Sequence, residues 1–112
     1  MVKTEQDIIE LAYKYARELE KLGVPVEEIL LFGSYARGEA RTFSDIDLAI
    51  VSTRFGKGDG LEFSGILSQA RLSINEIIEA IGLSPEQIDK APKYSLIEDI
   101  KKTGKVVYKK AA

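Results

Sequence analysis

The stretch Ile29-Leu30-Leu31-Phe32-Gly33-Ser34 decides the fold of this chain, together with Ser44-Asp45-Ile46-Asp47-Leu48 shortly after it. The apolar run that ends at Gly33 is typical of a buried strand. Gly33 lacks a Cβ atom, so the backbone can turn tightly there and come close to a bound molecule. Ser34 can cap a helical turn or donate to a phosphate oxygen. If residues 34–40 form one or two helical turns, their free N–H groups favour an anion beyond the strand end.

Asp45 and Asp47 open a second apolar run, Leu48-Ala49-Ile50-Val51. Because side chains alternate between the faces of a strand, both carboxylates point to the same face, with their Cα atoms roughly 7 Å apart. They can converge on one or two hard cations such as Mg²⁺, which proteins hold with one or two carboxylates, substrate phosphates and water. Two such ions clamp the attacking and leaving oxygens of a phosphoryl displacement. The chain has no His and no Cys, so a zinc site of the usual ligand types is not expected.

Each part of this pattern also has a purely structural interpretation. Asp-x-Asp at a strand start is commonly a turn or cap, and Gly-Ser after a strand is commonly only a turn. Arg37 suits a phosphate, but it and Arg41 can equally be solvated charges or ion-pair partners of Glu39 or Asp45. Ser44 is a candidate nucleotide contact, although its hydroxyl can instead orient the turn before Asp45. The ordered combination favours the functional interpretation.

Apolar periodicity predicts the remaining elements. We expect an amphipathic helix over residues 4–22, strands over 27–32 and 45–52, and a long helix over 63–81 that closes at Gly82. The glycine-rich segment 54–60 predicts a flexible connector, with a lid over a nucleotide as the alternative. Ser95 and Glu98 predict a capped third helix that ends at Gly104, and residues 105–109 predict a last strand. This alternation indicates an α/β or α+β domain in which helices cover a small sheet.

Size and composition bound the class of protein. The 112 residues fit a single domain over 1–112, and 45% hydrophobic residues suffice for a core. A net charge of −2 does not favour strong nonspecific binding to nucleic acid. The absence of cysteine fits a reducing cytoplasm. We expect a cytoplasmic protein without a membrane span or signal peptide, because no apolar stretch is long enough and the N-terminus is acidic.

The pattern GSxARG at residues 33–38, followed after five residues by SDxDL at 44–48, resembles the motif of the nucleotidyltransferase superfamily that includes DNA polymerase beta. The size of the chain is similar to that of the minimal nucleotidyltransferase family. The resemblance implies a small mixed β-sheet flanked by helices, with Mg²⁺ and ATP at one site. By resemblance, Gly33 and Ser34 contact the nucleotide phosphates, and Asp45 and Asp47 are catalytic and bind Mg²⁺.

Larger members of that superfamily add a third carboxylate on a later strand, as a metal ligand or base. By resemblance this role falls on Asp89, as a catalytic residue and metal ligand, with Glu86 as the alternative. The segment Ser84-Pro85-Glu86-Gln87 also has the pattern of a capped helix start. A helix there would aim Asp89 differently from a strand.

Minimal nucleotidyltransferases are commonly paired with HEPN-domain proteins as toxin–antitoxin modules, in which some transfer AMP to a tyrosine of the partner. The resemblance therefore implies Mg²⁺-dependent transfer of a nucleoside monophosphate, AMP from ATP, to a hydroxyl on a HEPN-domain partner. The alternative is a catalytically weak or inactive nucleotide-binding module that neutralises the same partner by direct binding.

Overall fold

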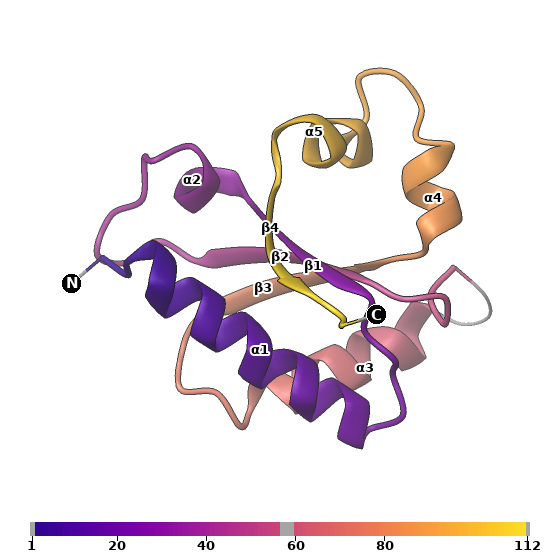
Figure 1. Ribbon diagram of the computed structural model, residues 1–112, viewed down its shortest axis with the longest axis horizontal. Coiled ribbons are helices and arrows are strands. Elements are labelled where there is room, and N and C mark those ends of the chain that lie inside the picture. Colours follow the sequence, from indigo (N-terminus) through magenta and orange to yellow (C-terminus); the bar gives the residue numbers. More distant parts are fainter. Residues whose placement is uncertain (1, 57–59, 112) are drawn as a thin grey trace.

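The computed structural model describes residues 2–56 and 60–111, and a four-stranded mixed β-sheet lies at its centre (Figure 1). The strands are β1 (Glu28–Phe32), β2 (Ile46–Val51), β3 (Ile78–Leu83) and β4 (Lys105–Lys109), in the spatial order β3-β2-β1-β4. β1 pairs antiparallel with β2 and with β4, whereas β2 and β3 are parallel. A parallel pair needs a crossover connection, which contains α3 (Gly60–Arg71).

Helices cover both faces of the sheet (Figure 1). α1 (Glu5–Lys21) and α3 pack on one face, and α4 (Pro85–Asp89) and α5 (Leu96–Thr103) lie over the other. The short helix α2 (Gly33–Ala36) follows the end of β1. This α+β arrangement, a small mixed sheet flanked by helices, confirms the predicted fold class.

The sheet has a hydrophobic core on each face, and alternate strand residues belong to one core or the other. The core under α1 and α3 takes Ile29 and Leu31 from β1 and Leu48 from β2. The core under α4 and α5 takes the intervening residues Leu30 and Ala49. Since side chains alternate along a strand, residues two positions from Ala49 also face the α4–α5 layer. Asp47 is such a residue, so the strand period sets the face on which it lies.

The helix starts follow their capping residues. Thr4 Oγ1 accepts from the backbone N–H of Asp7 at 3.1 Å, which begins α1 where the sequence predicts it. Ser84 caps α4 in a full capping box, with Pro85 at the first helical position. Ser95 caps α5 through the N–H of Glu98 at 3.1 Å. No helix in the described ranges is long and apolar enough to span a membrane.

The predicted long helix over 63–81 is correct only as far as Arg71 and is wrong beyond it. α3 ends at Arg71, a hydrogen-bonded turn follows, and residues 78–83 form β3 instead. The isoleucines of this segment recur at helical spacing, but they are β-branched and pack well in a strand. Gly82, predicted as a helix end, lies inside β3, where an added Cβ would come 2.9 Å from Phe55 Cδ2. Residues 57–59 of the predicted connector lie outside the described residues.

Candidate active site

Gly33 joins β1 to α2 with a φ of +74°, a conformation that side-chain-bearing residues rarely adopt. A Cβ atom built at this position would lie 2.1 Å from Asp47 Oδ2. The backbone therefore approaches the Asp47 carboxylate as closely as only glycine permits. The next residues form a compact turn, in which the N–H of Glu39 donates to the Ser34 carbonyl at 2.9 Å.

The other side of α2 is anchored to the body of the protein. Tyr35 and Ala36 pack against the core under α1 and α3. The backbone N–H of Lys3 donates to Tyr35 Oη at 3.2 Å. These contacts fix the Gly33–Ser34 turn at the end of β1, next to the start of β2.

Asp45 follows a closed turn that ends at Ser44. Ser44 Oγ accepts from the N–H of Arg41 at 2.7 Å, and the N–H of Ser44 donates to the Arg41 carbonyl at 2.9 Å. The structure thus supports the orienting role of Ser44, the alternative to a nucleotide contact. Phe43 stands at this turn with its side chain 89% exposed.

Glu79 is a functional candidate that the sequence predictions missed. Asp47 pairs in register with Phe32 of β1 on one side and with Glu79 of β3 on the other. Because these two positions are paired in register on neighbouring parallel strands, the Asp47 and Glu79 side chains lie on the same face of the sheet. A third carboxylate therefore lies beside Asp45 and Asp47, on the strand that was predicted as helix.

The electrostatic environment of Asp47 reflects this crowding. Burial raises the pKa of Asp47, and the negative charges of Glu79 and Asp45 raise it further. The nearby positive charge of Arg37 lowers that pKa in part. A cation bound at the Asp47 carboxylate would offset the repulsion from Glu79 and Asp45.

The predicted grouping of Asp89 with Asp45 and Asp47 is wrong. Asp89 ends α4 and lines a pocket with Glu28 and Val51, which pair at the opposite end of the β1–β2 ladder from Asp47. Four strand steps separate the two ends by roughly 13 Å. The alternative Glu86 is in the same helix, where its carboxylate accepts from Lys90 Nζ at 2.9 Å. The capping box at Ser84 turns this segment into a helix that lies away from the site.

The donor set fits Mg²⁺. Within the ranges that the structure describes, no three Asp or Glu side chains already converge as a complete metal site. Mg²⁺ does not require this, because one or two carboxylates commonly hold it together with water and substrate phosphates. Asp45 and Asp47 can supply those carboxylates, and the negative charge of Asp45 helps raise the pKa of Asp47, as expected for two neighbouring carboxylates.

Arg37 forms an ion pair with Glu39, one of the two interpretations that the sequence allows. Its Nε donates to Glu39 Oε1 at 2.5 Å, and both side chains are largely exposed. An exposed pair of this kind contributes little stability. Arg37 can therefore exchange Glu39 for a phosphate without a large penalty.

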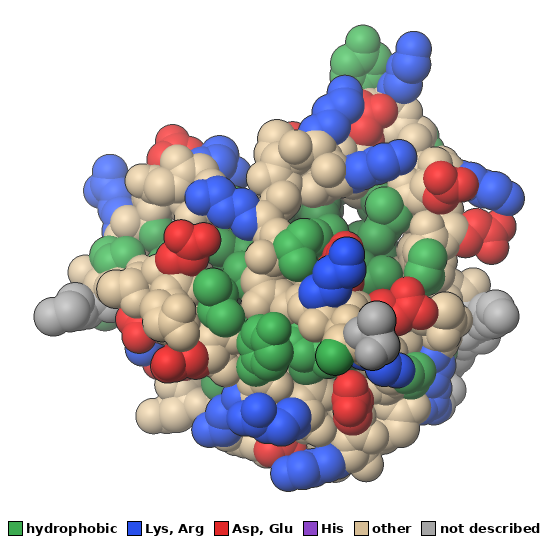
Figure 2. Space-filling view, in the orientation of Figure 1, with side chains coloured by type: hydrophobic (Ala, Val, Ile, Leu, Met, Phe, Trp, Pro, Cys, Tyr) green, Lys and Arg blue, Asp and Glu red, His purple; other side chains and the backbone are tan. Residues whose placement is uncertain are grey.

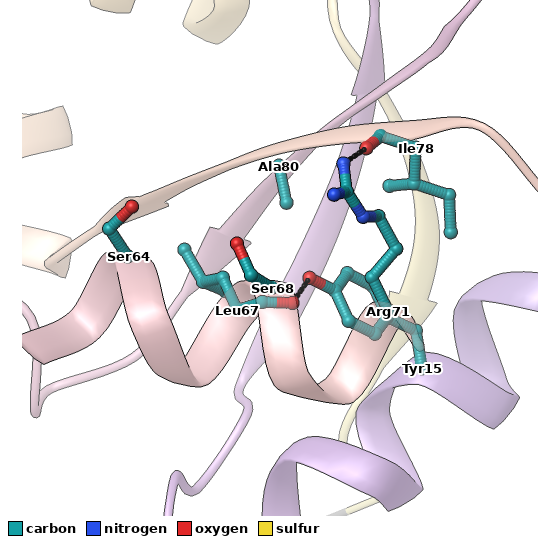
Figure 3. Close-up of a pocket in the computed structure, with 7 residues that line it drawn as sticks. All are labelled: Tyr15, Ser64, Leu67, Ser68, Arg71, Ile78 and Ala80. Atoms are coloured by element: carbon teal, nitrogen blue, oxygen red, sulfur yellow. Dashed lines mark hydrogen bonds between the residues drawn. The ribbon is translucent and has the colours of Figure 1, made fainter. Parts of the chain in front are cut away.

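The strand that carries Glu79 is held in place from the opposite face of the sheet. A pocket of about 60 Å³ lies between α3 and β3 (Figure 3). Beside it, an Arg71 side-chain N–H donates to the Ile78 carbonyl at 3.0 Å, and Tyr15 Oη donates to the Leu67 carbonyl at 2.8 Å. These bonds tie α1, α3 and the start of β3 together, one residue before Glu79.

Known proteins are similar to this chain in sequence and in fold. The model of the nucleotidyltransferase domain family matches residues 12–110. A Methanocaldococcus jannaschii protein named "Putative protein adenylyltransferase MJ0604" is 34% identical over 83 residues, which cover 74% of this chain and 79% of that protein. A crystal structure described as a putative nucleotidyltransferase from Sulfolobus solfataricus has a TM-score of 0.67 at 22% identity and covers 94% of this chain and 83% of its own. A toxin–antitoxin structure with AMP-PNP has a TM-score of 0.58 at 20% identity, over 86% of this chain and 72% of its own.

Proposed function

The chain belongs to the nucleotidyltransferase domain family, and on that premise we propose that it transfers AMP from ATP to a hydroxyl group on a partner protein, with Mg²⁺ as the metal. One observation carries the proposal. Asp47 is close enough to both Asp45 and Glu79 for their charges to raise its pKa, and the backbone of the Gly33–Ser34 turn nearly touches it. Carboxylates next to a glycine–serine turn suit a metal-bound nucleoside triphosphate.

Each group has a separate task in this proposal. Asp45 and Asp47 hold Mg²⁺, which neutralises phosphate charge when bound. Gly33 and Ser34 receive the phosphates, and Arg37 leaves Glu39 to contact them. Glu79 accepts the proton of the acceptor hydroxyl. The acceptor oxygen forms a bond to the α-phosphorus, the bond from that phosphorus to the pyrophosphate oxygen breaks, and pyrophosphate leaves.

Two similarities to known proteins suggest what the acceptor protein is. A structural neighbour is a toxin–antitoxin complex with AMP-PNP, and the motif resembles that of minimal nucleotidyltransferases, which are paired with HEPN-domain proteins. We therefore propose a HEPN-domain toxin as the acceptor. The alternative of an inactive module rested in part on an uncertain third carboxylate, and Glu79, which pairs with Asp47, is a candidate for that role.

The test is transfer of label from ATP, radiolabelled at the α-phosphate, in host lysate with Mg²⁺. Wild type is compared with Asp45→Asn and Asp47→Asn, and the melting temperature with Mg²⁺-ATP is measured in parallel. A protein band labelled only by wild type supports the transferase and gives the mass of the acceptor. Undiminished labelling by folded variants contradicts the roles of both aspartates.

A further inference from the structure

Three exposed apolar side chains gather at the end of the sheet where the candidate active site lies. Phe43, Leu72 and Ile77 expose 89%, 84% and 61% of their side chains. Phe43 precedes β2, whereas Leu72 and Ile77 belong to the segment between α3 and β3. Both segments lie on the left of Figure 1, the side at which β2 and β3 begin. We call Phe43, Leu72 and Ile77 together the apolar rim.

Ile77 borders the carboxylates directly. Its carbonyl accepts from the N–H of Ile46 at 2.9 Å, which extends the β2–β3 ladder by one residue toward Asp45. Because Ile78 belongs to the core under α1 and α3, strand alternation places Ile77 and Glu79 on the opposite face of the sheet. Two strand residues span roughly 7 Å. An acceptor that brings a hydroxyl group to Glu79 therefore passes next to Ile77.

Phe43 occupies a turn position that apolar side chains seldom take. The N–H of Ser44 donates to the Arg41 carbonyl at 2.9 Å, which makes Phe43 the third residue of a four-residue turn. The hydroxyl of Ser44 closes the same turn by accepting from the N–H of Arg41 at 2.7 Å. Such positions favour glycine, proline, asparagine, aspartate and serine. A hydrogen-bonded turn that presents a phenyl ring to solvent departs from this rule, and departures of this kind are expected at functional sites.

A hollow of about 400 Å³ joins two members of the apolar rim. Its lining consists of Arg71, Leu72, Ile74, Asn75, Glu76 and Ile77. The two charged members of this lining already have partners, because Arg71 donates to the Ile78 carbonyl at 3.0 Å and Glu76 forms an ion pair with Lys3. The contact that a partner can gain here is therefore mainly apolar, and the hollow suits an apolar side chain.

The apolar rim favours a protein over other acceptors. A small molecule in the hollow would leave Phe43 uncovered, because this residue stands exposed on a separate segment. A nucleic acid would bring its phosphates close to Asp45 and Glu79, in a chain whose net charge is −2. In Figure 2, hydrophobic side chains appear between charged ones on this side of the molecule. Exposed apolar side chains bordered by charged groups mark surfaces that another protein covers.

We propose that the apolar rim is the docking surface for the acceptor protein. An apolar side chain of that protein enters the hollow between Leu72 and Ile77 and also covers Phe43, while a hydroxyl group nearby reaches Glu79. The inference rests on the proposed function and adds to it the surface that selects the acceptor. The apolar rim and the groups proposed to hold Mg²⁺ and ATP are different residues, so acceptor binding and nucleotide binding can be changed separately.

The test measures steady-state transfer to the protein that the lysate assay labels, identified by its mass and then purified. Phe43→Ala and Ile77→Ala should each raise the KM for that protein by about 10- to 100-fold, the range expected when one buried side chain of this size is lost. The kcat at saturating acceptor, the KM for ATP and the rise in melting temperature with Mg²⁺-ATP should stay at wild-type values. Leu96→Ala is the matched control, since Leu96 is 57% exposed at the start of α5, and its KM should not change.

The possible results separate this inference from the proposed function. Wild-type KM values for Phe43→Ala and Ile77→Ala, or an equal increase for Leu96→Ala, would overturn the inference while transfer itself persists. A wild-type dimer in sedimentation that Phe43→Ala dissociates would assign the apolar rim to a second copy and would also overturn it. If wild type transfers label to no protein and Mg²⁺-ATP does not stabilise it, the proposed function fails and the inference fails with it.

Discussion

Replacement of Gly33 by alanine should disturb Asp47 directly. Gly33 and Gly38 have nearly the same φ, +74° and +72°, but a Cβ at Gly38 meets nothing within 4 Å. The left-handed backbone costs either alanine about 1–2 kcal/mol, and reduced freedom of the unfolded chain offsets about 0.4–1 kcal/mol of this. Gly38→Ala should therefore lower the free energy of unfolding by about 1 kcal/mol.

Gly33→Ala should cost more, because its Cβ would lie 2.1 Å from Asp47 Oδ2 and the carboxylate must leave its rotamer. An off-rotamer side chain adds about 0.5–1.5 kcal/mol. Urea unfolding of both variants, in wild-type and Asp47→Ala backgrounds, measures this excess. The excess should shrink when the Asp47 carboxylate is absent. Of the two glycine variants, only Gly33→Ala should lose the stabilisation by Mg²⁺-ATP. Equal costs at the two glycines with Asp47 present would refute the reasoning.

Three further changes test the site and its support. Glu79→Gln should abolish most label transfer, whereas Asp89→Asn should leave it intact; the reverse result would restore Asp89 as the third carboxylate. The pKa of Asp47 is raised from 3.8, so above that pH the folded protein without bound metal holds more protons than the unfolded chain. Its free energy of unfolding should therefore fall as the pH rises through the raised pKa. Urea titrations in EDTA at several pH values should show this slope, and Asp47→Asn should flatten it. Tyr15→Phe removes a buried hydrogen bond to the Leu67 carbonyl and should cost about 1–2 kcal/mol in urea unfolding, with label transfer unchanged.

The sequence predicts the part of the site that is local along the chain. The apolar run before Gly33 and the spacing of Asp45 and Asp47 depend only on strand geometry and turn chemistry, so both aspartates are found near the turn as expected. The capping pattern at Ser84 is equally local and predicts α4. Such features need no knowledge of distant contacts.

The third carboxylate was missed because its position depends on contacts distant in sequence. Isoleucines 74, 77, 78 and 81 recur at helical spacing, and only pairing with β2 makes residues 78–83 a strand. The polar Glu79 between Ile78 and Ile81 was the available signal, since a charged residue inside an apolar strand pattern indicates a site rather than core. The resemblance instead implied Asp89, in a segment whose capping pattern also indicated the helix that the structure shows.

The parallel pairing of β2 with β3 also has a kinetic consequence. Asp47 and Glu79 are far apart in sequence and meet only when β3 docks, so their repulsion is absent from any partly folded state that lacks this pair. If β3 docks after the folding transition state, the repulsion accelerates unfolding and leaves the folding rate unchanged. Glu79→Gln should then shift only the unfolding arm of a chevron plot, and a shift of the folding arm would place this pairing early. The same carboxylates that equip the site for a cation would in that case limit the lifetime of the metal-free fold.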